Sequence, residues 1–175
     1  MKTRTLTLTA LFVALGVILP AAFHLARIGG PIFLPMHLPV LIAGLYLGPL
    51  SGTVVGLLSP PLSFLTTGMP PLSPPIMPMM MPELGTYGLV AGLAYRRLRW
   101  PLYLSLVVAL LAGRLALGAA AAVAVAAVGF RMPPHLYVWG ALVKGLPGIG
   151  IQLVLVPLLV RLLERSVPAG KVGER

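Results

Sequence analysis

The sequence predicts an all-α integral membrane protein, and three observations support this prediction. Of the 175 residues, 58% are hydrophobic and only 9% are charged, whereas a soluble domain has about a quarter of its residues charged. The apolar residues form long runs. Pro and Gly separate these runs, which is the pattern that helices crossing a bilayer leave in a sequence. We therefore expect a single transmembrane domain, residues 1–175.

The apolar runs predict six transmembrane helices, at about 6–24, 38–48, 52–65, 79–95, 101–129 and 136–163. The first run follows a basic start that resembles a signal peptide, but it is long enough to span the bilayer, and we expect it to be retained. The second and third helices are short and meet at a turn in "GPLSG". Five prolines in "TTGMPPLSPPIMP" cannot continue a helix, so this segment is either a lid over a site or an ordered loop.

The basic residues predict the orientation of the chain. Nine of the 13 basic residues gather at the N-terminus, in one loop and at the C-terminus, namely Lys2, Arg4, Arg96, Arg97, Arg99, Arg161, Arg165, Lys171 and Arg175. By the positive-inside rule all three places are cytoplasmic. Six helices satisfy this condition and five do not. We expect no nucleic-acid surface, because no basic patch with aromatic residues is present.

Three charges lie deep inside the predicted spans, far from their cytoplasmic ends. At about 1.5 Å per residue, Glu83, Arg114 and Lys144 lie about 18, 20 and 24 Å from the cytoplasmic ends of their helices. Each costs at least about 2.5–3.5 kcal/mol in lipid, so each should face protein or water. We expect one shared cavity that is open to the outside. The alternative is a Glu83–Arg114 pair that only locks two helices together, and both interpretations can hold at once.

Further residues are candidates for contact with a ligand in this cavity. If Glu83 pairs with one base, the other base stays positive, which suits a carboxylate or a phosphate. Gln152 lies deeper on the last helix. Tyr87 follows Glu83 by one turn and is expected to contact ligand or to pack in the core. His37 begins the second helix, where ligand contact and a hydrogen bond at the helix start are equally expected.

Small residues on the first helix predict a close helix contact. Ala10 and Ala14 are spaced i, i+4, and small residues at this spacing let another helix approach. The contact is either with a partner subunit or within the bundle.

The sequence excludes several kinds of enzyme. Three acidic residues in the whole chain cannot form the carboxylate clusters that metal-dependent phosphotransfer needs. A phosphate-binding loop is absent, and so is the Gly-x-Ser-x-Gly of a serine hydrolase. We expect no catalytic activity, no metal site and no cofactor.

These features resemble the substrate-binding S component of an energy-coupling factor (ECF) vitamin transporter. The resemblance spans nearly the whole chain and is most specific in "LPMHLPVLIAGLYLGPLSGTVVGLLSPPLSFLTTGMPP" and the following "MMMPELGTYGLVAGLAY". It implies a bacterial plasma-membrane protein with a vitamin site near the outer face. It also implies that Ala10 and Ala14 dock on a membrane-embedded coupling subunit, which two cytoplasmic ATPases drive.

The resemblance leaves the cargo open. A spare positive charge favours a small anionic vitamin, and pantothenate is the first expectation, with folate, niacin and riboflavin as alternatives. Two other functions compete with this one. In the first, the chain is an autonomous transporter in which Glu83 carries a proton. In the second, it is a structural membrane subunit without ligand.

Overall fold

The computed structural model describes residues 3–26, 30–73, 75–129 and 133–166, and within these ranges the chain is helical without strands. The elements in chain order are α1 (Thr3–Leu25), α2 (Gly30–Phe33), α3 (His37–Leu47), α4 (Pro49–Thr67), α5 (Ile76–Gly92), the π-helical turn η1 (Leu93–Arg97), α6 (Leu102–Val128) and α7 (Pro134–Ser166). Helices α1, α3, α4, α5, α6 and α7 correspond to the six predicted helices.

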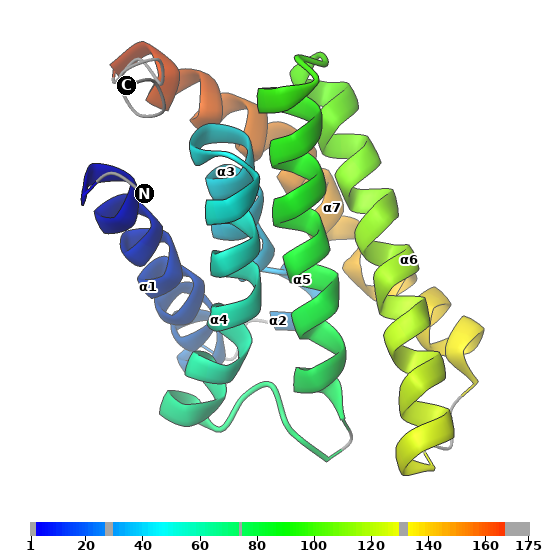
Figure 1. Ribbon diagram of the computed structural model, residues 1–175. Helices are drawn as coiled ribbons and strands as arrows, with labels where there is room; N and C mark the ends of the chain where they lie inside the picture. Colours follow the sequence, from blue (N-terminus) through cyan, green and yellow to red (C-terminus); the bar gives the residue numbers. More distant parts are fainter. Residues whose placement is uncertain (1–2, 27–29, 74, 130–132, 167–175) are drawn as a thin grey trace.

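The helices alternate in direction (Figure 1), so the start of α1 and the end of α7 lie at one end of the bundle, and residues 68–73 lie at the other. Four helices among the described residues are long and apolar enough to cross a membrane: α1, α4, α6 and α7. Helix α3 has only 11 residues and is too short by this measure. The six spans and the cytoplasmic termini remain predictions.

Three local features differ from the sequence prediction. Helix α2 forms inside the segment expected to be a plain connection. Helix α5 begins at Ile76, before Pro78, so the helix-free part of the Pro-rich segment is shorter than expected. A proline in the first turn is tolerated because its missing N–H would have had no helical partner there. Finally, α5 runs into a π-helical turn, which the sequence did not indicate.

Glycines bring α3, α4 and α5 into backbone contact. A Cβ added to Gly44 would lie 2.5 Å from the carbonyl oxygen of Gly88, and one added to Gly52 would lie 2.6 Å from the same atom. The turn between α3 and α4 is made by Gly48, whose φ of 108° is open to glycine and strained for other residues. Because the contacts are between backbones, these three helices form a tightly packed unit on which the polar side chains are positioned.

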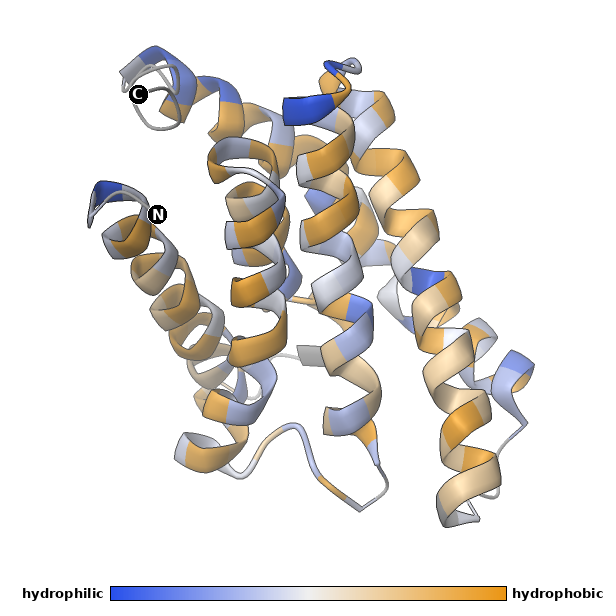
Figure 2. Ribbon diagram, in the orientation of Figure 1, coloured by the Kyte–Doolittle hydropathy of each residue, from blue (hydrophilic) through white to orange (hydrophobic). Residues whose placement is uncertain are grey.

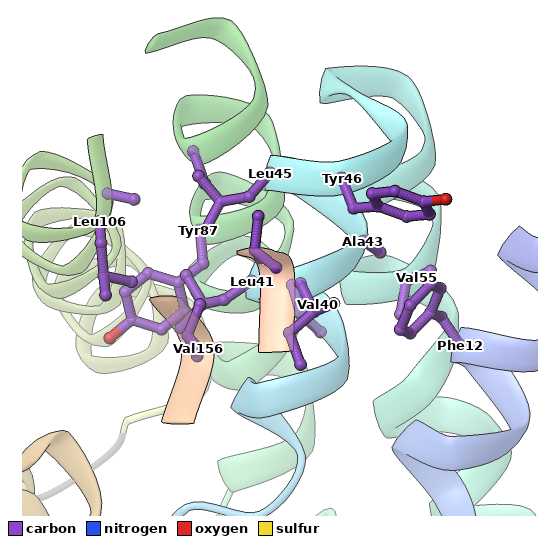
Figure 3. Close-up of a cluster of buried hydrophobic side chains, with 14 of the residues drawn as sticks. Phe12, Val40, Leu41, Ala43, Leu45, Tyr46, Val55, Tyr87, Leu106 and Val156 are labelled. Atoms are coloured by element: carbon purple, nitrogen blue, oxygen red, sulfur yellow. The ribbon is translucent and has the colours of Figure 1, made fainter. Parts of the chain in front are cut away.

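The main core lies between this unit and α6 and α7 (Figure 3). Leu41 of α3, Tyr87 of α5, Leu106 of α6 and Val156 of α7 are fully buried members of one cluster. Phe12 of α1 packs against the other side of the same cluster. The core therefore joins helices that are far apart in the sequence.

Helix α1 packs on α4 through one face and leaves another face uncovered. The Thr9 hydroxyl donates to the Ser51 hydroxyl over 3.0 Å, and a Cβ at Gly16 would overlap the side chain of Ser59. On the uncovered face, Ala10 and Ala14 are exposed. Within the described chain, the two alanines are not in the interior of the bundle.

The outer surface of the bundle is apolar (Figure 2). Large apolar side chains such as Leu115 (77% exposed) and Val123 (66%) are exposed. The most hydrophilic segments gather at the end where α1 begins and α7 ends. An apolar belt of this extent is typical of a surface that lies in lipid, because water would drive it to aggregate.

At that hydrophilic end, polar contacts join α3, η1 and α7. Arg96 donates from Nη2 to the carbonyl of Tyr46 over 2.8 Å, and its Nη1 lies 3.8 Å from Glu164. The Tyr95 hydroxyl donates to Glu164. Partial burial, and then the Glu164 carboxylate, raise the pKa of Tyr95 above its usual value. These contacts are about one quarter exposed, so they contribute little to stability.

Candidate ligand-binding site

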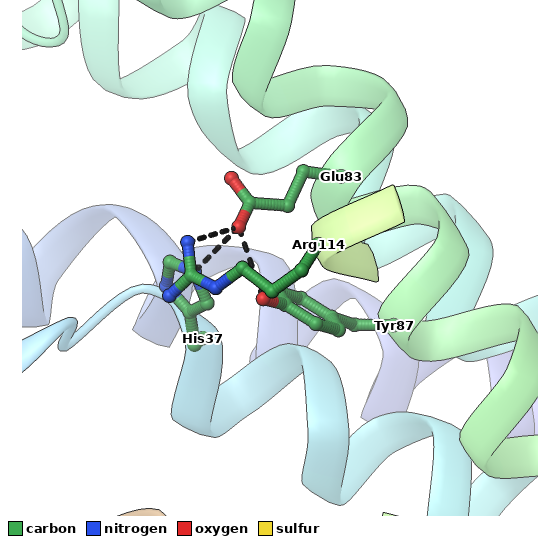
Figure 4. Close-up of polar contacts among 4 residues, drawn as sticks. All are labelled: His37, Glu83, Tyr87 and Arg114. Atoms are coloured by element: carbon green, nitrogen blue, oxygen red, sulfur yellow. Dashed lines mark hydrogen bonds and ion pairs between the residues drawn. The ribbon is translucent and has the colours of Figure 1, made fainter. Parts of the chain in front are cut away.

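Glu83 is the centre of a buried polar cluster (Figure 4). Its Oε1 accepts a hydrogen bond from Arg114 Nη1 at 2.8 Å and another from the Tyr87 hydroxyl at 2.9 Å. The Glu83 residue is 3% exposed and Tyr87 is fully buried. The ion pair between Glu83 and Arg114, which was the alternative to a shared cavity, is therefore present, and it joins α5 to α6. We call His37, Glu83, Tyr87 and Arg114 the Glu83 cluster.

Local packing explains how these side chains meet. Tyr87 follows Glu83 by four residues, so both lie on one face of α5. The Tyr87 ring lies directly against Gly113 of α6, where any Cβ would overlap the ring. A residue with a side chain at position 113 would push α6 away from α5. Gly113 therefore sets the short distance across which its neighbour Arg114 reaches Glu83.

His37 joins the cluster from α3 without a hydrogen bond. Its Nε2 lies 3.8 Å from Glu83 Oε1, which is too long for a hydrogen bond. Its ring centroid lies 5.2 Å from that of Tyr87, at a tilt of 52°. The residue is 2% exposed, and neither ring nitrogen has a hydrogen-bond partner among the described residues. An imidazole that is buried in this way has hydrogen-bonding capacity left over.

The Arg114 guanidinium is only partly used. Nη1 donates to Glu83, whereas the buried Nε has no partner. Nη2 makes no hydrogen bond to a described residue, and it faces α7, because a Cβ added to Gly145 would lie 3.4 Å from it. The same Cβ would lie 3.0 Å from Cδ1 of Leu34, whose backbone is left-handed with φ of 51°. The Nε–Nη2 edge of Arg114 thus lies near Gly145 of α7 without a hydrogen-bond partner among the described residues.

Near the Glu83 cluster, helix α7 carries the buried polar residue Gln152 and the exposed cation Lys144. Gln152 is fully buried, and neither atom of its amide has a hydrogen-bond partner among the described residues. Lys144, by contrast, is exposed and forms no ion pair with a described residue. The structure therefore brings Glu83, Tyr87, His37 and Arg114 together and leaves Lys144 outside their contacts.

Two parts of this region were not predicted from the sequence. Tyr137 of α7 packs against a second buried cluster, which consists of Met79, Leu117, Ala121 and Ala124. Leu34 covers Gly145 from a segment expected to be a plain connection. The spacing of Tyr137, Ala141 and Lys144 places them on one side of a helix, and this pattern would have been the available signal for Tyr137.

The helices and the apolar surface define a multi-pass membrane protein. The model of the family described as "ECF transporter, substrate-specific component" matches residues 4–160. The chain belongs to this family, whose members are the substrate-binding subunits of ECF transporters and not enzymes. No curated protein and no solved structure matches the chain.

Proposed function

We propose that this chain is the high-affinity binding subunit of an ATP-driven ECF importer and that its cargo is a small vitamin with a carboxylate. The observation that carries the proposal is the unpaired Nε–Nη2 edge of Arg114. Two parallel N–H groups on one edge of a guanidinium match the two oxygens of a carboxylate. Glu83 occupies only Nη1, so a second carboxylate can bind without displacing it.

Pantothenate remains the first expectation for the cargo. Its carboxylate would bind at Arg114, and its hydroxyl and amide groups would meet polar side chains of the interior. Glu83 Oε2 accepts no hydrogen bond from a described residue and is one acceptor for such a hydroxyl. Tyr87 would hold Glu83 in place, while His37 and Gln152 would offer further polar atoms.

Lys144 has a different part in this proposal. It neighbours Gly145, which faces Arg114, but it is exposed and without an ion pair to a described residue. A cation without an ion pair on an apolar helix is energetically costly, so such a residue usually serves a function. We infer that Lys144 attracts the anionic cargo toward Arg114.

The proposed partners are a membrane-embedded coupling subunit and two cytoplasmic ATPases, in a bacterial plasma membrane with both termini of this chain in the cytoplasm. The exposed Ala10 and Ala14 support a docking face on α1, because α1 uses Thr9 and Gly16 for its contact with α4. Small exposed residues at i, i+4 allow a second helix to approach closely in lipid.

Mass spectrometry of the small molecules released from the purified, denatured chain tests the proposal. We expect one vitamin with a carboxylate in stoichiometric amount. Calorimetric titration of the purified chain with that vitamin should give tight binding, and uptake by vesicles should need ATP and the partner subunits. Uptake by this chain alone, driven by a pH gradient, would establish the proton-coupled transporter instead.

One observation favours the structural alternative as well. The 2.8 Å pair between Glu83 and Arg114 holds α5 to α6 whether or not a ligand binds. A purified chain that carries no vitamin and binds none would leave this structural role as the function of the pair.

A further inference from the structure

Gln152 is an anomaly in the interior of the bundle. The neighbouring buried positions of α7 are Gly145, Gly148 and Val156, which are small or apolar. Gln152 is fully buried among them, yet both its amide nitrogen and its amide oxygen lack a partner among the described residues. Buried polar atoms almost always have partners, because an unpaired one loses its hydrogen bonds to water without replacement.

His37 shows the same anomaly on α3. It is 2% exposed, and both ring nitrogens lack a hydrogen bond among the described residues. Together with Gln152 it leaves four buried polar atoms unpaired in one small membrane domain. Gln152 makes no hydrogen bond to a described residue, and His37 makes only a 3.8 Å approach to Glu83 Oε1, so hydrogen bonding within the described chain does not explain why either polar side chain is buried.

The packing places the two residues on facing turns. Helices α3 and α7 are in contact and run in the same direction (Figure 1). Leu41 of α3 and Val156 of α7 belong to one core cluster (Figure 3). Each of them follows one of the polar residues by one helical turn on the same face, since His37 precedes Leu41 by four residues and Gln152 precedes Val156 by four. Gln152 and His37 therefore face the same interior, without a hydrogen bond to each other.

Gln152 is separate from the carboxylate-binding edge of Arg114, whereas His37 lies near it, since its Nε2 is 3.8 Å from the Glu83 Oε1 that accepts from Arg114. The Nη2 atom of Arg114 is level with Gly145. Gln152 follows Gly145 by seven residues, which is about 10 Å along the axis of α7. One small ligand of this length can reach both places.

We propose that Gln152 is the centre of a neutral hydrogen-bonding subsite, which binds an uncharged hydroxyl or amide group of the cargo. An amide side chain both donates and accepts, so it matches a group that also does both. His37 adds unpaired hydrogen-bonding atoms beside Glu83. The Gln152 amide carries no charge opposite to a carboxylate. The inference rests on the proposed function and adds to it that the cargo is bifunctional, with a carboxylate at one end and a neutral polar group about 10 Å away.

Two probes and one substitution test this subsite. The probes are pantothenate and N-(3,3-dimethylbutanoyl)-β-alanine, which keeps the carboxylate and lacks both hydroxyls. The variant is Gln152→Leu, which is similar in volume and removes the amide. Titration calorimetry on the full purified chain measures both affinities, and thermal unfolding without ligand measures stability. The matched control is Val154→Leu, an exposed position on the same helix.

We expect the natural chain to bind pantothenate about 10-fold more tightly than the analogue, as one hydrogen bond between neutral groups allows. Gln152→Leu should lose this discrimination, with the affinity for the analogue unchanged. Its unfolding temperature without ligand should be equal to or higher than that of the natural chain, because an unpaired amide has been removed. The control should change neither quantity.

Two results would overturn the inference. If Gln152→Leu still prefers pantothenate by the same factor, the amide holds only ordered water. If the variant unfolds at a lower temperature without ligand and binds both probes equally weakly, Gln152 has a structural role. If the natural chain binds neither probe, the pantothenate proposal is wrong. The unfolding temperatures measured without ligand then decide the inference about Gln152. A lower unfolding temperature for Gln152→Leu than for the natural chain rejects the inference, and an equal or higher one supports it.

Discussion

Arg114 donates from Nη1 to Oε1 of Glu83 over 2.8 Å and leaves its Nε–Nη2 edge without a partner among the described residues. One guanidinium thus has two separate functions available. Its Nη1 holds α6 to α5, and its other edge faces α7 near Gly145. This division separates the requirement for a positive charge from the requirement for a fork of two donors, and substitutions can distinguish the two.

Arg114→Lys should preserve folding and abolish tight binding. Lysine keeps the positive charge opposite Glu83, but it has no planar fork for a carboxylate. We expect a fall in vitamin affinity of about 10- to 100-fold, which corresponds to one or two charge-assisted hydrogen bonds. Calorimetry gives the affinity and thermal unfolding gives the stability. Arg114→Met is the comparison, and it should lose both. Undiminished affinity in the lysine variant would show that the Nε–Nη2 edge does not bind the carboxylate.

Glu83→Gln and Glu164→Gln should have very different effects on stability. The Glu83 side chain is 4% exposed, and the loss of its charge leaves Arg114, whose side chain is 12% exposed, without a counterion. Breaking a buried pair in this way costs about 3–5 kcal/mol. The Glu164 side chain is 27% exposed, and its pair with Arg96 should contribute less than about 1 kcal/mol. Unfolding in mixed micelles measures both free energies. Equal losses would mean that the Glu83 cluster is reached by water.

The sequence was sufficient for the helices and for the level of the charges, but not for the direction in which each charge points. Apolar runs and punctuating prolines define the helices, and counting residues from a helix end gives depth, which is why Glu83 and Arg114 were placed together. Depth also placed Lys144 beside them. Successive residues of a helix differ by about 100° in direction, so Lys144 is exposed while Gly145 beside it faces Arg114.

Backbone contacts were beyond prediction for a related reason. The glycines at 44, 52 and 88 come from three helices, and their meeting depends on how the helices are rotated against one another. Leu34 over Gly145 depends on the path of a short connection. Neither leaves a periodic signal in the sequence, because each is a contact between single residues of different segments.

Gly145→Ala should weaken binding while Gly140→Ala does not. A Cβ at Gly145 would lie 3.4 Å from Arg114 Nη2 and 3.0 Å from Leu34 Cδ1, whereas one at Gly140 would meet nothing within 4 Å. Both changes replace a helical glycine by alanine, which alone favours the helix by about 0.5–1 kcal/mol. We expect a loss of affinity at 145 alone, measured by calorimetry. Identical affinities in the two variants would show that cargo does not bind between Arg114 and α7.

Gly88→Ala should prevent correct folding. Its Cβ would overlap the backbone of Gly52, and a backbone cannot rotate away as a side chain can. Gly118→Ala is the control, since its Cβ would make an ordinary 3.5 Å contact with Val138. We expect a loss of at least about 3 kcal/mol at position 88, as for other severe overpacking. Yield and unfolding in detergent measure this difference. A Gly88→Ala chain as stable as the control would mean that α4 and α5 separate easily.

Ala10→Trp should abolish uptake without weakening vitamin binding. Ala10 is exposed on α1, away from the Thr9 contact with α4, so a large ring there should leave the bundle intact. It should, however, keep a partner helix from approaching, because small residues allow the closest contacts in lipid. Val123→Trp on α6 is the control, as it adds similar bulk at a position that is 66% exposed. Vesicle uptake with the partner subunits and ATP should stop for the α1 variant alone, while calorimetry gives equal affinities for both. Normal uptake by Ala10→Trp at normal expression would place the docking face elsewhere on the bundle.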